Sequence, residues 1–324
     1  MQSEVMEYFS SLDKFKSKKD GLIHTDSVKI ELLSPRTIHK KVPLNTINGQ
    51  PAYIKDSNSI NSAVGIATSE MYRDIGFVTP NQYILTTAPS HRKLFSRAKA
   101  HDPRFSALSI ITADISAIPN IESDLIDNII SERDKNSAPF RLGRYAWQFL
   151  YDPDVRAIML EYMTPETFNE MIGDSLVAEV RTDIDRHFQN AFLYKRTGKK
   201  KYEGFIPIDL DNLELLKHIY GKQFTKDNFE EFLASTYEST AVTGKHCNRA
   251  YMYRIADLKE IIDDGVIPPA SLAKLKSALE YDLPSTVDKH SRLREFSKQR
   301  KPVTTAYEML WDYNRRELRE SLGL

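Results

Sequence analysis

The chain reads DIDRHFQNAFLY over residues 183–194 and, after a basic turn, FIPIDLDN over residues 205–212. Two short apolar runs, 191–194 and 205–208, flank a polar tip, and this pattern predicts a β-hairpin. Acidic and amide side chains stand just before the first run and just after the second. The hairpin would therefore bring Asp185, Asn190 and Asp209 to one of its ends.

Oxygen-bearing side chains gathered in this way suit a hard divalent cation. Magnesium is usually held by one or two carboxylates together with substrate phosphates. Phosphoryl transfer needs such a cation, and it also needs a carboxylate that accepts the proton of the attacking hydroxyl. The spacing is similar to that of protein kinases, in which a catalytic aspartate stands five residues before a metal-binding asparagine and a second metal-binding aspartate follows on a later strand. Here Asn190 is the fifth residue after Asp185, and Asp209 closes the following strand.

The stretch resembles the catalytic and metal loops of the protein-kinase-like fold. Asp-Arg-His-x-x-Asn at residues 185–190 is most similar to bacterial HipA-type and CtkA-type serine/threonine kinases, in which a histidine follows the aspartate. The resemblance covers roughly residues 28–215. It implies an α+β, bilobal fold, with a β-rich N-lobe over residues 1–114 (an antiparallel sheet plus one glutamate-bearing helix) and a helical C-lobe over residues 115–324 that holds the catalytic and metal loops.

Two upstream residues match further features of that fold. Asn-Gly at residues 48–49 is a hairpin turn signal, and the strand that follows it ends near Lys55. A helix is predicted next, because apolar residues recur with a helical period over residues 60–75, and Glu70 falls in its second half. Kinases have a strand lysine and a helix glutamate in the same order. Taken singly, Lys55 would be interpreted as a plain edge-strand lysine, and a solvated glutamate on an exposed face remains an alternative for Glu70.

The resemblance implies a role for each of these residues. ATP would lie between the lobes, with Lys55 on its phosphates and Glu70 fixing Lys55. Catalysis would depend on Asp185, Asn190 and Lys55. Mg²⁺ would be held by three oxygen ligands, namely Asn190, Asp209 and Asp211.

Two segments compete for the hinge that would contact adenine. The preferred one consists of Thr112, Ala113 and Asp114, at the end of a strand predicted over residues 107–112. The rival, residues 158–163, is similar to the hinge of ordinary protein kinases, but it leaves only a single helix before the catalytic loop. That helix is predicted to start at Thr-Pro, residues 164–165.

The remaining helical candidates are spread over both halves of the chain. Periodicity predicts them at residues 123–133, 154–162, 225–238, 248–263, 269–280, 286–298 and 303–322. The C-terminal ones are separated by prolines, among them Pro284.

The chain departs from the kinase pattern in three places. The segment between residues 33 and 42, which would cover the nucleotide, contains no glycine. The metal motif at residues 209–211 is Asp-Leu-Asp in place of Asp-Phe-Gly, a form similar to aminoglycoside-type kinases. An activation segment with an obvious phosphosite is not visible.

The leading interpretation is an ATP-dependent protein kinase that transfers the γ-phosphoryl group to Ser/Thr hydroxyls. A pseudokinase that acts as a nucleotide-binding interaction module and a small-molecule kinase remain alternatives. A metal-dependent hydrolase built on Asp183, Asp185 and His187 is a further alternative, and it would need neither Lys55 nor Glu70.

Composition limits the partners. Lys plus Arg equals Asp plus Glu at 45 each, so the net charge of zero gives no clear sign of nucleic-acid or membrane binding. Cys247 is the single cysteine of the 324 residues, which excludes an internal disulfide and suits a reducing compartment. The N-terminus lacks the order of a signal peptide. We therefore expect a cytoplasmic protein, or an effector exported by a dedicated system, whose partners are a nucleotide and a protein substrate.

Overall fold

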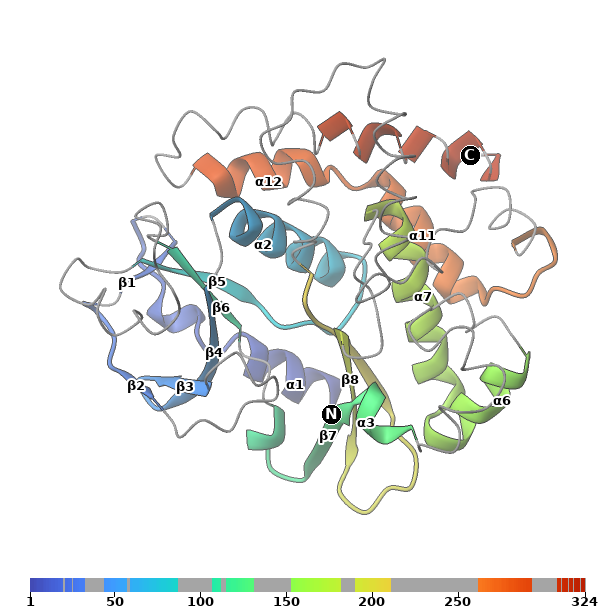
Figure 1. Cartoon of the computed structure of the whole chain (residues 1–324), viewed down its shortest axis with the longest axis horizontal. Coiled ribbons are helices and arrows are strands. Elements are labelled where there is room, and N and C mark those ends of the chain that lie inside the picture. The colour runs from blue at the N-terminus through green and yellow to red at the C-terminus, as the bar shows by residue number, and fades with distance from the viewer. Residues whose placement is uncertain are drawn as a thin grey trace, which may run out of the picture.

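The fold is a mixture of helices and two small sheets, seen in a computed structural model of the chain (Figure 1). The structure describes residues 1–19, 21–24, 26–32, 44–56, 59–86, 107–111, 115–130, 153–181, 190–210 and 262–292, and near the C-terminus residues 308–309, 311–313, 315–316, 318–320 and 322–323. No helix among these residues is long and apolar enough to cross a bilayer.

The larger sheet has six strands in the order β1-β5-β6-β4-β3-β2. Its strands are β1 (Ile23–His24), β2 (Ile30–Leu32), β3 (Leu44–Ile47), β4 (Gln50–Asp56), β5 (Gln82–Thr86) and β6 (Ala107–Ile111). Neighbouring strands are antiparallel except β1 and β5. The predicted turn between β3 and β4 is confirmed, because Asn48 and Gly49 have φ of 49° and 81°, as a two-residue hairpin turn requires.

Two helices are layered on this sheet. Helix α2 (Ser59–Asp74) packs against β5 and β6, and α12 (Leu283–Arg292) lies against α2 (Figure 1). The predicted helix is confirmed, and three of the apolar residues that set its period, Val64, Ala67 and Met71, are fully buried. The helix closes at Gly76, whose φ is 90°, and the Phe77 N–H donates to the Tyr72 carbonyl at 2.8 Å.

The second sheet has the order β7-β8-β9, with strands β7 (Ile121–Leu125), β8 (Ala191–Arg196) and β9 (Gly204–Pro207). The predicted hairpin is confirmed as β8–β9, in a register that runs from Ala191↔Pro207 to Tyr194↔Gly204. The helix predicted over residues 123–133 was wrong at its start. Residues 121–125 form β7, and the helix after it, α3, spans only Ile126–Ile129. Pairing with β8, far along the chain, overrides the local helical pattern.

The N-terminal helix α1 (Gln2–Phe9) joins the two sheets, and a short 3₁₀ turn (Asp13–Phe15) follows it. Its buried residues, Val5 and Phe9, pack in one cluster with side chains of the second sheet, including Phe192, Tyr194 and Ile206. The Tyr83 hydroxyl on β5 donates to the Phe9 carbonyl at 3.2 Å, which ties the helix to the first sheet as well.

Helices α6 (Pro153–Tyr162), α7 (Pro165–Arg181) and α11 (Pro269–Glu280) form the other side of the molecule (Figure 1). The Thr-Pro start of α7 is confirmed, since the Thr167 N–H donates to Thr164 Oγ1 at 3.3 Å. Helix α7 packs closely on α11, because a Cβ on Gly173 would lie only 3.1 Å from Cδ of Lys274. This close approach offsets the roughly 1 kcal/mol by which glycine disfavours a helix relative to alanine.

The C-terminal helices are confirmed in part. Helix α11 has the predicted bounds, whereas α12 begins at Leu283, three residues before the predicted start. Two further predicted helices lie outside the described residues, namely the one over residues 225–238 and all but the last two residues of the one over 248–263.

Candidate active site

The β8–β9 hairpin brings two of the predicted metal ligands to the same end. Asn190 directly precedes β8 and Asp209 is the second residue after β9. The Ile208 N–H donates to the Asn190 carbonyl at 2.9 Å, so the ladder continues one step past the last strand pair. Asn190 is buried at 4% exposure and Asp209 is half-buried. An amide and a carboxylate at this place are oxygen donors of the kind that Mg²⁺ prefers.

Asp209 has a left-handed backbone, with φ of 58°. Residues other than glycine seldom adopt this conformation, although Asp and Asn do so several times more often than the rest. Such a conformation costs of order 1–3 kcal/mol and persists only where the surroundings over-determine it, often at functional sites.

The surroundings of Asp209 meet that condition. Three hydrogen bonds hold the backbone on both sides of it: Thr79 Oγ1 to the Pro207 carbonyl (2.8 Å), the Ile208 N–H to the Asn190 carbonyl (2.9 Å), and Arg181 Nη2 to the Leu210 carbonyl (2.8 Å). The chain is thus fixed at both residues before Asp209, Pro207 and Ile208, and at Leu210 after it.

Arg181, at the last position of α7, is buried at 1% exposure. Its Nη1 donates to the Tyr72 hydroxyl on α2 at 3.2 Å, and its guanidinium lies 5.3 Å from the centre of the Tyr72 ring. Arg181 therefore joins α7, α2 and the turn at Asp209. The sequence predictions missed it, although it stands one helical turn after buried Val177, on the apolar face of α7.

Lys55 lies on an inner strand, because β4 runs between β6 and β3, and Lys55 is paired with Ser109. The alternative of an edge-strand lysine is therefore wrong. The structure describes only the backbone of Lys55, so its predicted contact with Glu70 stays a prediction.

Glu70 lies on α2 with 29% of its side chain exposed, and its Oε2 lies 3.0 Å from Nε2 of His290 on α12. The two atoms form an ion pair if the histidine is protonated, although their geometry falls short of a hydrogen bond. Burial by itself would raise the pKa of Glu70. The contact with His290 and the charges of Lys289 and Arg73 outweigh burial, so the pKa of Glu70 lies below its ordinary value of 4.5. Glu70 is thus a partly buried carboxylate, which corrects the alternative of a solvated surface residue.

The rival hinge is excluded by the structure. Residues 158–162 are helical and belong to α6, and Met159 is buried in the main core. A core helix is not the extended connection that a hinge requires. The preferred hinge residues, Thr112, Ala113 and Asp114, follow β6 directly but lie outside the described residues.

Four further predicted residues also lie outside the described residues. They are Asp185 and Asp211 of the kinase interpretation, and Asp183 and His187, which the hydrolase alternative needs together with Asp185. Within the part of the chain that is described, no three His, Cys, Asp or Glu side chains gather as a metal site.

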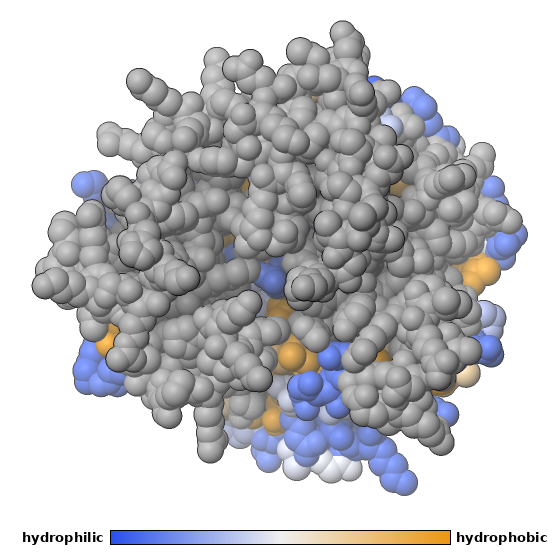
Figure 2. All heavy atoms as spheres, in the orientation of Figure 1, coloured by the Kyte–Doolittle hydropathy of each residue, from blue (hydrophilic) through white to orange (hydrophobic). Residues whose placement is uncertain are grey.

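The basic turn at the tip of the β8–β9 hairpin is exposed. Figure 2 shows hydrophilic residues gathered at the lower edge of the molecule, where Figure 1 places this hairpin. Acidic neighbours offset part of its charge, since Lys195 Nζ lies 3.4 Å from Glu122 and Lys199 Nζ lies 3.8 Å from Glu203. The tip thus gives no strong argument for a polyanionic partner.

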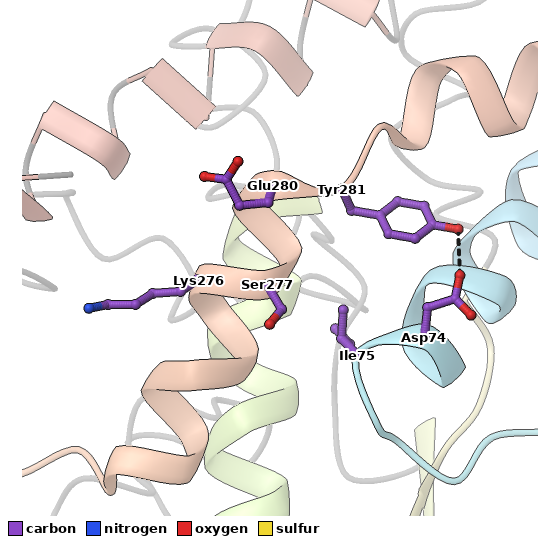
Figure 3. Close-up of a pocket in the computed structure, with 6 residues that line it drawn as sticks. All are labelled: Asp74, Ile75, Lys276, Ser277, Glu280 and Tyr281. Carbon is purple, nitrogen blue, oxygen red and sulfur yellow. Dashed lines mark hydrogen bonds between the residues drawn. The ribbon is translucent and has the colours of Figure 1, made fainter.

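A surface hollow lies beside the C-terminal end of α2 (Figure 3). Asp74 and Ile75 line one side, and residues at the end of α11 line the other, namely Lys276, Ser277, Glu280 and the following Tyr281. The Tyr281 hydroxyl donates to Asp74 Oδ2 at 3.1 Å, which ties α11 to α2. Of the predicted site residues that the structure describes, none is among the residues that line this hollow.

Comparison with known proteins supports a kinase-like fold. No protein-family model and no curated protein matches the chain. Among solved structures, it is similar to the Helicobacter pylori proinflammatory kinase CtkA, with a TM-score of 0.55 and 11% identity over 90% of this chain and 94% of that one. It is also similar to HipA in the Shewanella oneidensis MR-1 toxin–antitoxin complex of HipA, HipB and operator DNA, with a TM-score of 0.47 and 12% identity over 91% of this chain and 68% of the matched chain. The predicted resemblance is confirmed as a likeness of fold, and the comparison with CtkA is the one that supports it.

Proposed function

We propose that the chain is an ATP-dependent protein kinase that transfers the γ-phosphoryl group of ATP to Ser/Thr hydroxyls. The main support is the end of the β8–β9 hairpin, where Asn190 and Asp209 come together in a kinase-like fold and the left-handed turn at Asp209 is held from both sides. A strained acidic residue beside a buried amide is an arrangement that a metal–phosphate site would use.

In this proposal the molecule is bilobal and ATP binds between the lobes. The six-stranded sheet and α2 form most of the N-lobe, residues 1–114, and the second sheet with α6, α7 and α11 belongs to the C-lobe, residues 115–324. The packing of α2 against β6, the strand next to β4, supports a meeting of Glu70 with Lys55.

Each predicted residue then has a defined task. Asp185 orients the acceptor hydroxyl and takes its proton, while Lys55 binds ATP phosphates and is fixed by Glu70. The adenine contacts come from Thr112, Ala113 and Asp114. Mg²⁺, when bound, neutralises charge on the phosphates, and the residues that would hold it are Asn190, Asp209 and Asp211.

A nucleotide-binding pseudokinase is the second candidate, and two observations favour it. One carboxylate oxygen of Glu70 already contacts His290, which competes with a lysine partner. The segment between residues 33 and 42 contains no glycine to lie close over phosphates. A pseudokinase would bind ATP without transferring phosphate.

Two aspartate variants test the proposal, with labelled ATP and a mixture of protein acceptors for transfer and thermal shifts for binding. Asp185→Ala should abolish transfer while ATP still stabilises the fold, because this residue faces the acceptor. Asp209→Ala should weaken the Mg²⁺-dependent stabilisation by ATP. Asp263→Ala, at an exposed aspartate before α11, is the matched control and should change neither.

The outcomes separate the candidates. Binding without transfer in the unaltered protein favours the pseudokinase. Equal loss of ATP stabilisation in Asp185→Ala and Asp209→Ala would overturn the division of roles. An unaltered protein that neither binds ATP nor transfers phosphate refutes the proposed function.

A further inference from the structure

We infer that Arg181 is a positioning residue that couples the placement of α2 to the metal-binding conformation of Asp209. The inference rests on the proposed function, since it assigns control over the same metal site. It adds to the predicted site a residue that lies on neither the catalytic loop nor the metal loop.

The first step is the choice of residue. Arg181 is buried at 1% exposure, and burying a guanidinium is unfavourable unless its donors are bound. An apolar side chain of similar length could fill the space at lower cost. Arginine offers a rigid fork of donors, and here two of its nitrogens bind groups on two different elements, the Leu210 carbonyl and the Tyr72 hydroxyl.

The second step is the position of the Leu210 carbonyl. It is one residue after Asp209, whose φ of 58° must be imposed by its neighbours. Thr79 fixes the chain two residues before Asp209, through the Pro207 carbonyl. Without the Arg181 bond, these contacts would hold the chain only on the side before Asp209. Asp209 could then relax toward an ordinary backbone conformation.

The third step is the contact with α2. Tyr72 is fully buried and stands two residues after Glu70, and its ring centre lies 4.9 Å from that of Phe77. Because the same guanidinium binds Tyr72 and the Leu210 carbonyl, a shift of α2 must move or break one of the two bonds. The position of the helix that holds Glu70 is thereby transmitted to the residue that would hold Mg²⁺.

The test is a Mg²⁺ titration of the thermal stabilisation by saturating ATP, on Tyr72→Phe, Arg181→Lys and Arg181→Met. Coupling between sites commonly changes affinity about 5- to 150-fold. We expect the Mg²⁺ concentration for half-maximal stabilisation to rise at least about threefold in Tyr72→Phe and about tenfold or more in Arg181→Met. Arg181→Lys should fall between them, because lysine keeps the positive charge but loses the forked pair of guanidinium donors. Stabilisation by ATP in EDTA should be unchanged.

Tyr83→Phe is the matched control, because it also removes a buried, hydrogen-bonded tyrosine hydroxyl, in this case one on β5 that donates to the Phe9 carbonyl. It should lower the melting temperature without moving the Mg²⁺ midpoint. If Tyr72→Phe and Arg181→Lys likewise lose stability but keep the unaltered midpoint, Arg181 is merely structural and the inference is overturned. These two mild variants decide the matter if Arg181→Met does not fold. An unaltered protein without any Mg²⁺-dependent stabilisation by ATP overturns the proposed function itself.

Discussion

Gly204→Ala should strongly destabilise the hairpin on which the candidate site is built. Gly204 on β9 is paired with Tyr194 on β8, and the tyrosine ring lies over it. A Cβ at position 204 would be 2.1 Å from Cζ and 2.3 Å from Cε1 of that ring, whereas real Cβ contacts essentially never fall below 3.0 Å. The ring must therefore move by about 1 Å or leave its place.

The cost follows from the burial of the ring. Tyr194 is 2% exposed and packs with Val5 and Phe9 of α1. Expelling an aromatic ring exposes about 150–250 Å², or about 4–6 kcal/mol at about 25 cal/mol per Å². If the neighbours yield instead, overpacking costs about 1–3 kcal/mol. We expect a loss of about 2–5 kcal/mol, which lowers the melting temperature by on the order of 5–10 °C.

The assay is urea denaturation of Gly204→Ala in two backgrounds, unaltered and Tyr194→Leu. Once the ring is gone, alanine meets no clash, and its lower unfolded-state entropy should leave it neutral or stabilising by about 0.4–1 kcal/mol. The coupling between the two positions should thus reach at least about 2 kcal/mol. An equal loss in both backgrounds, or no loss in the unaltered one, would refute the reasoning.

Three further changes address the site itself. Glu70→Gln should lower the free energy of unfolding by on the order of 1 kcal/mol at neutral pH. Because the folded pKa of Glu70 lies below 4.5, the stability that its charge contributes is complete above pH 4.5 and is lost as the pH falls through the folded pKa. The difference in unfolding free energy between the variant and the unaltered protein should therefore disappear below pH 4.5, which denaturation curves at a series of pH values would show. Thr79→Val leaves the buried Pro207 carbonyl without its donor and should cost about 1–3 kcal/mol in urea, while Thr79→Ser keeps most of the stability; equal losses would contradict this. Lys55→Met should remove most phosphoryl transfer and leave the melting temperature within about 2 °C, because the ion pair proposed between Lys55 and Glu70 would contribute only about 0–1 kcal/mol to stability. Unchanged transfer would count against a kinase.

Local signals predicted much of the fold. The Asn-Gly turn at residues 48–49 needs two positive φ angles, and those residue types tolerate them. The helical period before Gly76 and the Thr-Pro start of α7 likewise depend on residues within a few turns. The meeting of Asn190 and Asp209 was predictable for the same reason, because a hairpin fixes its own ends.

Distant partners explain what the sequence patterns missed. Strand β7 was taken for helix because its partner β8 begins at residue 191. Pro284 was expected to separate helices, yet it stands at the second position of α12, where a missing N–H costs little. Arg181 bonds to Tyr72 across 109 residues, and Thr79 to Pro207 across 128, so no local spacing could predict either contact.

The docking of α1 on the second sheet has a consequence for synthesis on the ribosome. Phe9 packs in a cluster with Phe192, roughly 180 residues later, so the helix is translated long before the β8–β9 part of the surface that covers it exists. At about 5–20 residues per second, the interval is on the order of 10–40 s. Until then Val5 and Phe9 lack the side chains that β8 and β9 add to their cluster, and the nascent chain presents a partly uncovered apolar helix face that a chaperone could hold.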